Sequence, residues 1–283
     1  MSQIESLTLQ KTISDLFERQ KEFPDFDQLS SEQKQAIERA VEGLDQGLWR
    51  VCSQESPDGP WITHQWLKQA ILLYFRLRKM ELMDSGDFNY FDKIPLKKWT
   101  GQEGVRVVPQ ALVRRGAFVS SGAILMPSYV NIGAFVGGGS MIDTWATVGS
   151  CAQVGKNVHI SGGVGLGGVL EPVQANPVII EDHCFIGSRS IVVEGVIVRE
   201  GAVLGAGVTL TASTKIIDVT GSEPKISRGE VPANSIVIPG SINKKFPAGE
   251  YGTPCALIIG QRTEQTDKKT SLTEALRDFE VPV

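Results

Sequence analysis

The chain has 283 residues, more than the roughly 100–150 of a common single domain, so we expect a main body with appended segments. Its 28 basic and 32 acidic residues give a net charge of −4, which excludes an overall attraction to nucleic acid or to an anionic membrane. No apolar stretch reaches the ~20 residues of a membrane-spanning helix and no secretory leader is recognisable, so we expect a cytoplasmic protein.

The N-terminal part, residues 1–100, is predicted to form a helical domain. In SSEQKQAIERAVEGL, Ser30 and Gln33 have the spacing of a capping box, and apolar residues follow at helical intervals. The stretch THQWLKQAILLYFRLRKM, from residue 63 to residue 80, continues the helical pattern.

From residue 101 to residue 240, aliphatic residues recur every six positions. A period of six fits neither a helix nor a continuous strand, but it fits short strands joined by bends, three to each turn of a coil. The sequence therefore predicts a mainly β fold built around a parallel β-helix. The aliphatic positions are Val107, Val113 and Val119 in a first block, Val130, Val136, Ile142, Val148, Val154, Ile160 and Leu166 in a second, and Ile180, Ile186, Val192, Val198, Leu204, Leu210 and Ile216 in a third.

Two irregularities interrupt the repeat. The spacing from Val119 to Val130 is one residue short of two repeats, which predicts a tighter bend. Between Leu166 and Ile180 the sequence GGVLEPVQANP contains two prolines, which favours a loop extruded from the coil. Residues 241–283 are predicted to form a C-terminal appendage of strand and helix, because Ser271 and Glu274 have the spacing of another capping box.

Four cysteines, Cys52, Cys151, Cys184 and Cys255, lie far apart in the sequence and include no CxxC pair. This pattern favours buried free thiols over a zinc site or a redox dithiol. We expect no bound metal and no permanently bound cofactor.

An acid, Asp143, occupies a bend position that neighbouring repeats give to glycine. Counting along the repeat places Val107 and Ile142 on the same side of the coil, two turns apart, so that Arg106 and Asp143 flank one corner at about 10 Å. His159 falls near the same corner, one turn further along. Asp143 could instead only stabilise its own bend through backbone hydrogen bonds, and Arg106 could be a solvated surface charge.

Several stretches together resemble the tetrahydrodipicolinate N-succinyltransferase family of hexapeptide-repeat acyltransferases. They are WITHQWLKQAILL, YFDKIPLK, EGVRVVP, LMPSYVNIGAFV, MIDTWATVGSCAQVGKNVHISGGVGLGGVLEPVQANPVIIEDHCFIGSRS and VVEGVIVREG. The resemblance implies a left-handed coil, a homotrimer with sites between neighbouring chains, and transfer of succinyl from succinyl-CoA, the co-substrate, to the amine of a small dicarboxylate.

Carried over by position, the resemblance gives residue roles. Asp143 matches the acid at the reacting amine, and Arg106 matches the binder of a substrate carboxylate. Where the family often has glutamate after FIGARS, this sequence has Ile191, so Glu194 is the remaining candidate for a second substrate-binding carboxylate. The resemblance also places succinyl-CoA along the coil wall, near four residues: Gly168, Ser188, Ala206 and Lys215.

Three alternatives remain open. A different acyl-CoA-dependent N-acyltransferase, using an acetyl donor or an amino-sugar acceptor, would rely on His159 as its base. A γ-type carbonic anhydrase would need three histidine ligands, but only His159 and His183 lie in the coil. A bare β-helix scaffold would leave the extruded loop and Asp143 without a purpose.

Overall fold

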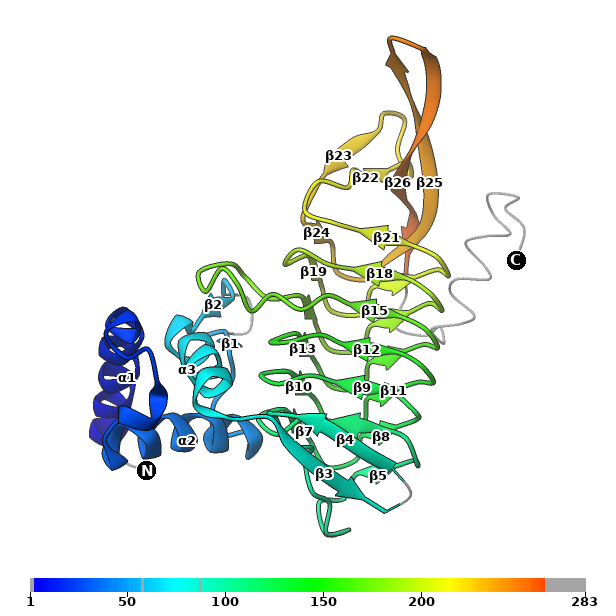
Figure 1. Cartoon of the computed structure of the whole chain (residues 1–283). Helices are drawn as coiled ribbons and strands as arrows, with labels where there is room; N and C mark the ends of the chain where they lie inside the picture. Colours follow the sequence, from blue (N-terminus) through cyan, green and yellow to red (C-terminus); the bar gives the residue numbers. More distant parts are fainter. Residues whose placement is uncertain (1–2, 57–58, 87, 263–283) are drawn as a thin grey trace.

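The structure is a computed structural model, and it describes residues 3–56, 59–86 and 88–262. A group of helices at the N-terminal end lies beside a tall coil of short strands, and a long two-stranded hairpin extends beyond the last turn of the coil (Figure 1). In the part of the chain that the structure describes, no helix is long and apolar enough to cross a membrane.

Three α-helices form the N-terminal body. They are α1 (Gln3–Glu18), α2 (Ser31–Asp45) and α3 (Gln65–Leu77), with short 3-10 turns η1 (Gln20–Glu22) and η2 (Phe26–Gln28). The capping box of α2 is confirmed, because Ser30 Oγ accepts from Gln33 N and the Gln33 side chain accepts from Ser30 N. Helix α1 lies in the part predicted to be helical, but its bounds were not predicted from the sequence. The helices bury one another's apolar faces, including Ile13, Ile37, Leu67 and Tyr74.

Two small antiparallel pairs accompany the helices. Strand β1 (Cys52–Ser53) pairs with β2 (Ile62–Thr63), and β3 (Glu81–Ser85) pairs with β4 (Phe88–Asp92). Residues 93–105 connect the second pair to the first turn of the coil, and neither pair was predicted from the sequence.

The coil is a left-handed parallel β-helix, a three-sided prism. Face 1 contains β5 (Arg106–Val107), β8 (Ile124–Leu125), β11 (Met141–Ile142), β14 (His159–Ile160), β17 (Phe185–Ile186) and β20 (Val203–Leu204). Face 2 contains β6 (Leu112–Val113), β9 (Tyr129–Val130), β12 (Thr147–Val148), β15 (Gly165–Leu166), β18 (Ile191–Val192) and β21 (Thr209–Leu210). Face 3 contains β7 (Phe118–Val119), β10 (Phe135–Val136), β13 (Gln153–Val154), β16 (Ile179–Ile180), β19 (Ile197–Val198) and β24 (Glu230–Val231).

The second residue of nearly every strand points into the prism and is buried. Ile142, Val148 and Val154 are fully buried on successive faces of one turn, and the turns above and below repeat the pattern. The predicted six-residue period therefore corresponds to one strand and one bend, and stacking of the turns covers the aliphatic residues.

Three corners join the faces, and each is named here by one residue. The Asp143 corner, from face 1 to face 2, comprises residues 108–111, 126–128, 143–146, 161–164, 187–190 and 205–208. The Arg115 corner, from face 2 to face 3, comprises 114–117, 131–134, 149–152, 167–178 and 193–196. The Lys156 corner, from face 3 to face 1, comprises 120–123, 137–140, 155–158, 181–184 and 199–202.

Both predicted irregularities have a place in this frame. The missing residue falls between Leu125 and Val130, where the bend 126–128 on the Asp143 corner has three residues instead of four. The extruded loop 167–178 leaves the Arg115 corner and rests on the helical body, where the Lys68 Nζ donates to Pro172 O at 3.1 Å and Ala175 O at 2.8 Å. Lys68 is fully buried by this contact.

The end of the coil differs from the prediction. Ile216, counted as a repeat position, lies in β22 (Ile216–Asp218), which pairs with β23 (Lys225–Ser227) and β26 (Gly249–Gln261) and not with face 3. Strand β25 (Ser235–Phe246) pairs with β20 at its start and then forms a long hairpin with β26. The expected boundary at residue 240 falls inside β25, and the expected helix at Ser271 lies outside the described residues.

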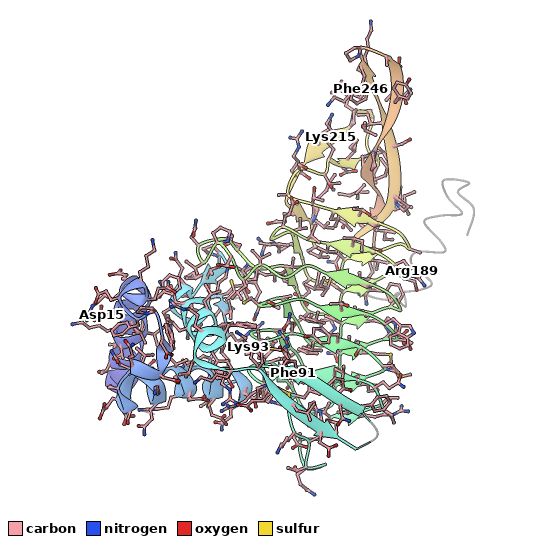
Figure 2. All side chains as sticks on the ribbon, in the orientation of Figure 1. Asp15, Phe91, Lys93, Arg189, Lys215 and Phe246 are labelled. Carbon is pink, nitrogen blue, oxygen red and sulfur yellow. The ribbon has the colours of Figure 1, made fainter. Side chains whose placement is uncertain are left out.

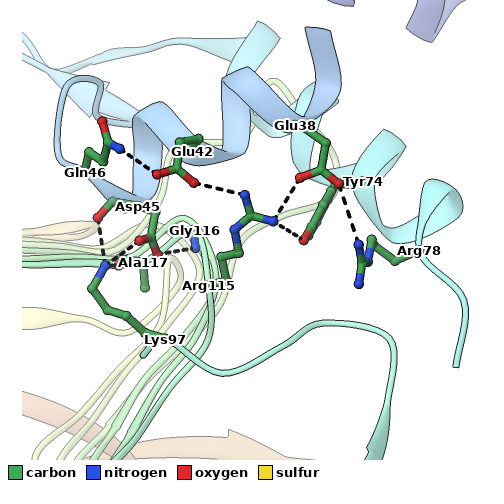
Figure 3. Close-up of polar contacts among 10 residues, drawn as sticks. All are labelled: Glu38, Glu42, Asp45, Gln46, Tyr74, Arg78, Lys97, Arg115, Gly116 and Ala117. Atoms are coloured by element: carbon green, nitrogen blue, oxygen red, sulfur yellow. Dashed lines mark hydrogen bonds and ion pairs between the residues drawn. The ribbon is translucent and has the colours of Figure 1, made fainter. Parts of the chain in front are cut away.

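The helical body is held against the Arg115 corner by polar contacts as well as by apolar packing. The Arg115 guanidinium lies 2.9 Å from both Glu38 and Glu42 on α2, and it donates to Tyr74 Oη on α3 at 3.1 Å (Figure 3). Lys97 contacts Asp45 at 2.7 Å nearby. All four cysteines are free and buried, as the sequence predicted.

Candidate functional site

Asp143 sits in the bend after β11, on the Asp143 corner. Its Oδ1 accepts from the backbone N of Thr144 at 2.6 Å and from Thr144 Oγ1 at 3.2 Å. The bend-stabilising contacts of an aspartate are therefore present, but they use one oxygen only. Oδ2 faces Gly162 in the next turn. If Gly162 had a Cβ atom, that atom would lie 4.0 Å from Oδ2. A half-buried carboxylate with one oxygen held and the other facing a glycine can accept a proton from a ligand.

The bend beside Asp143 is unusual in two ways that the sequence analysis missed. Trp145 has a left-handed backbone, with φ of 61°, and yet it is 68% exposed. Its N–H donates at 2.6 Å to Pro127 O, in the shortened bend of the preceding turn. Trp145 takes the bend position that Gly163 and Gly207 take in other turns. This large aromatic residue in place of glycine was a signal available from the sequence.

Arg106 and His159 occupy the same face as Asp143, as the count predicted. The pairing register runs from Arg106 through Ile124 and Met141 to His159, so Arg106 lies two turns from the Asp143 strand and His159 one turn on the other side. Arg106 is exposed; its backbone N–H donates to Ala123 O at 3.0 Å, and its guanidinium has no hydrogen bond or ion pair with any residue of the described chain. His159 stacks on Phe185, with ring centroids 5.2 Å apart and planes 19° apart.

The residues expected beside succinyl-CoA separate into two groups. Ser188 and Ala206 are exposed on the Asp143 corner in successive turns, and Gly207 N donates to Ser188 O at 3.0 Å. Gly168 lies at the start of the extruded loop on the Arg115 corner. Lys215 lies beyond β21 near β22, whereas Arg189 marks the edge of the coil beside Ser188 (Figure 2).

Glu194 is on a different corner from Asp143. It follows β18, has φ of 57°, and its Oε2 accepts from Ala212 N at 3.1 Å. A single chain therefore does not bring Glu194 to the bend that holds Asp143. Ile191 is 37% exposed on face 2, where its Cδ1 would lie 3.0 Å from a Cβ on Gly165.

The three histidines lie in separate places. His159 is on face 1, His183 is exposed on the Lys156 corner, and His64 Nε2 lies 2.6 Å from Ser53 Oγ in the helical body. Within the described ranges, no group of three or more His, Cys, Asp or Glu side chains could hold a metal ion.

The repeat first defines the class of the protein. A left-handed coil of six-residue units is the architecture of hexapeptide-repeat proteins, and residues 177–212 match the family model for the hexapeptide repeat of succinyl-transferase. Residues 8–77 match the model for the N-terminal region of tetrahydrodipicolinate N-succinyltransferase.

Comparison with full-length proteins then narrows the class to a family. A 2,3,4,5-tetrahydropyridine-2,6-dicarboxylate N-succinyltransferase of Acinetobacter baylyi is 52% identical over 250 residues, covering 86% of this chain and 89% of the relative. The protein of the same name from Methylobacillus flagellatus is 52% identical over 276 residues, covering 95% and 98%. The chain belongs to the tetrahydrodipicolinate N-succinyltransferase family.

A solved structure shares the fold at much lower sequence similarity. A Campylobacter jejuni protein assigned as a 2,3,4,5-tetrahydropyridine-2-carboxylate N-succinyltransferase superposes with a TM-score of 0.51 at 17% identity, over 79% of this chain and 62% of the other. At this level of identity the likeness supports the fold alone.

Proposed function

We propose that the protein transfers the succinyl group of succinyl-CoA to the amino group of ring-opened tetrahydrodipicolinate, giving N-succinyl-2-amino-6-oxopimelate on the succinylase route to diaminopimelate and lysine. The observation that carries this proposal is 52% identity to N-succinyltransferases over nearly the full length of both chains. The reaction uses an intracellular acyl-CoA, and we place the protein in the cytoplasm.

Asp143 is the proton acceptor in this proposal. The substrate nitrogen attacks the thioester carbonyl carbon, the C–S bond of the tetrahedral species breaks, and CoA leaves as a thiolate that takes up a proton. The attacking nitrogen must lose a proton, and Oδ2 of Asp143 is the oxygen left to accept it, because Thr144 holds Oδ1. Fixing the carboxylate in this way also orients it toward the reacting amine.

Arg106 binds a carboxylate of the acceptor. Its guanidinium offers a planar fork that matches a carboxylate, and it has no competing ion pair among the described residues. Two strand spacings separate its turn from that of Asp143, on the order of 10 Å along the face. A dicarboxylate with an amino group can span that distance.

Succinyl-CoA extends from Asp143 along the same corner, past Ser188 and Ala206. The exposed backbone of the successive bends that hold Ser188 and Ala206 gives its pantetheine arm hydrogen-bonding partners. Gly168, Glu194 and Lys215 lie on other parts of the prism, so their proposed contacts with CoA or substrate require a neighbouring chain. This requirement supports a homotrimer with sites between prisms. Light scattering tests the homotrimer directly, because it should give a molar mass three times that of one chain.

The activity is tested with purified protein, tetrahydrodipicolinate and either succinyl-CoA or acetyl-CoA, by following release of the CoA thiol. We expect thiol release with succinyl-CoA that depends on the acceptor and is weaker with acetyl-CoA. Preference for acetyl-CoA would favour the other N-acyltransferase reading, and absence of thiol release with both donors would remove the proposal.

A further inference from the structure

A pocket of about 340 Å³ lies on the Lys156 corner, away from Asp143. The segment between α2 and α3 forms one wall with Arg50 and Trp61, and the prism forms the other with Phe135 and Lys156. The acyl-transfer proposal gives this pocket no role.

Arg50 is held rigidly in the pocket wall. Its guanidinium carbon lies 3.8 Å from the ring centroid of Phe135 and 5.6 Å from that of Trp61. Its Nε donates to Gln153 Oε1 at 3.1 Å, and Gln153, itself buried, donates through Nε2 to Cys151 O at 2.8 Å. The fork is therefore fixed in position before any ligand arrives.

Among the described residues, the Arg50 guanidinium makes no direct hydrogen bond or ion pair with a carboxylate, and Asp182 acts on its charge only from a distance. Across residues 3–56, 59–86 and 88–262, neither Nη1 nor Nη2 has a hydrogen-bonding or ion-pair partner. Burial lowers the pKa of the Arg50 guanidinium to about 10, because it has lost much of its hydration. A fixed, partly desolvated guanidinium with two free N–H edges is a receptor for a carboxylate.

The rim of the same pocket supplies negative charge. Of its three acids, Glu181 is already engaged, since it accepts from Trp61 Nε1 at 2.8 Å and from Arg199 Nη1 at 2.8 Å. Asp182 accepts from the backbone of Lys156 at 2.8 Å, and the carboxylate of exposed Glu200 has no hydrogen bond within the described residues. The positive charges of Arg50 and Lys156 thus lie in one pocket with the negative charges of Asp182 and Glu200, so a molecule with both charges can pair with both sets, whereas a simple anion leaves the acids unpaired.

We propose that this pocket binds a small zwitterionic α-amino acid, with its carboxylate on Arg50 and its ammonium group toward Asp182 and Glu200. The volume accommodates such a molecule together with a side chain, and the rings of Trp61 and Phe135 provide apolar surface beside the guanidinium. Within one chain the pocket opens at a different corner of the prism from Asp143, and the Asp143→Asn variant below tests that the two sites are separate.

The test measures binding by the intact protein. Each common L-α-amino acid is added singly at about 10 mM, a concentration at which millimolar binding raises the melting temperature measurably. The strongest binder is then titrated by calorimetry, together with its analogue that lacks the amino group. We expect at least one amino acid to stabilise the protein and its desamino analogue to bind at least roughly tenfold more weakly, since the charge-assisted contact to the acids is lost.

Four variants locate the site. Arg50→Met and Glu200→Gln should each weaken binding, the first by roughly 10- to 100-fold. Glu200 is exposed and its carboxylate has no hydrogen bond or ion pair in the described chain, so its variant separates loss of binding from loss of folding. Arg115→Met also removes a guanidinium between the helical body and the prism, but one outside the pocket, and should leave binding unchanged. Asp143→Asn should leave it unchanged as well.

Three results with the amino acids would overturn the proposal, and a fourth comes from the desamino analogue. The three are the absence of stabilisation by any amino acid, unchanged binding in Arg50→Met, and loss of binding in Asp143→Asn, which would place the ligand in the acceptor site. Equal binding of the desamino analogue would show a site for simple carboxylates and would also contradict the proposal.

Discussion

The Asp143 corner and the Arg115 corner are made by the same repeat, yet they carry different residues. The backbone takes up a left-handed conformation in most bends at both corners. On the Arg115 corner the left-handed residues are Gly116, Gly133, Cys151, Glu194 and Gly195, and on the Asp143 corner they are Gln110, Trp145, Gly163, Arg189 and Gly207.

The difference follows from what lies over each corner. A Cβ on Gly133 would stand 2.7 Å from Ile71 Cδ1 of α3, and one on Gly116 would stand 3.0 Å from Val41 Cγ1 of α2. No helix of the described chain covers the Asp143 corner, so Trp145 and Arg189 can project. A left-handed residue other than glycine costs about 1 kcal/mol, and Trp145 carries this cost beside Asp143 with its side chain 68% exposed.

The largest effect is expected at Asp143. Asp143→Asn keeps an oxygen for the contacts to Thr144 but cannot accept the proton, so kcat/KM should fall by about 10²- to 10⁴-fold while the melting temperature stays close to that of the parent. Initial rates of thiol release with succinyl-CoA measure it.

His159→Ala is the matched control for the neighbouring turn. It should keep kcat/KM within about tenfold, because His159 is stacked on Phe185 and is not the proton acceptor proposed here. Loss of activity in His159→Ala with activity retained in Asp143→Asn would reverse the assignment and favour a histidine-based N-acyltransferase.

The second largest effect separates the two corners by stability. Gly133→Ala places a methyl group against Ile71 and Cys151 at a φ of 77°, so we expect a loss of about 2–4 kcal/mol in unfolding free energy from strain and overpacking. Gly207→Ala, at a φ of 73° with nothing within 4 Å, should lose only about 1 kcal/mol. Urea unfolding at a fixed protein concentration compares the two variants. Equal losses of unfolding free energy would show that the helical body does not restrict which residues fit on the Arg115 corner.

The coil was predictable from the sequence because its rule is local. The register of Arg106, Asp143 and His159 on face 1 and the shortened bend before Val130 both followed from counting, since each strand pairs with the residue one turn away. Ile216 broke the count because β22 pairs with β26, a strand about forty residues further along that the period cannot reveal.

The site was less predictable for the same reason. Glu194 was chosen by its nearness in sequence to Ile191, but one further strand-and-bend step places it on another corner. Trp145 was overlooked because a single aromatic residue in a bend gives no periodic signal. Arg50 was overlooked because its surroundings, Phe135 and Gln153, come from residues more than eighty positions away.

A smaller effect concerns the contact that fixes the helical body to its corner. Arg115→Met removes the ion pairs to Glu38 and Glu42 and should cost about 1–2 kcal/mol, since the partners are partly exposed. The hydrogen bond from Arg115 lowers the pKa of the Glu42 carboxyl. The stabilisation from this contact is therefore complete above the ordinary carboxyl pKa near ~4.3, and it is lost as the pH falls through the lowered pKa of Glu42.

The variant should therefore differ from the parent most at neutral pH and least in acid. Melting temperatures of the variant and the parent, measured from pH 7 down to about pH 3, test this. The two melting temperatures should converge as the pH falls below the lowered pKa of Glu42. A constant offset across the whole range would mean that Arg115 acts through packing and not through its charge.

The smallest expected effect is the response of Cys151, a reporter of the covered corner, to Arg115→Met. Its thiol lies under the helical body, and burial raises its pKa to about 12. Because the thiolate is the reactive form, alkylation by iodoacetamide at about pH 8 should be roughly a thousandfold slower in the native protein than in urea. In Arg115→Met, easier local opening of the helical body should speed modification of Cys151. Cys184, buried inside the prism, should stay protected, as peptide mass spectrometry can show. Equal acceleration at both thiols would mean that the prism and the helical body open as one unit, and the contrast between the two corners would then not extend to their dynamics.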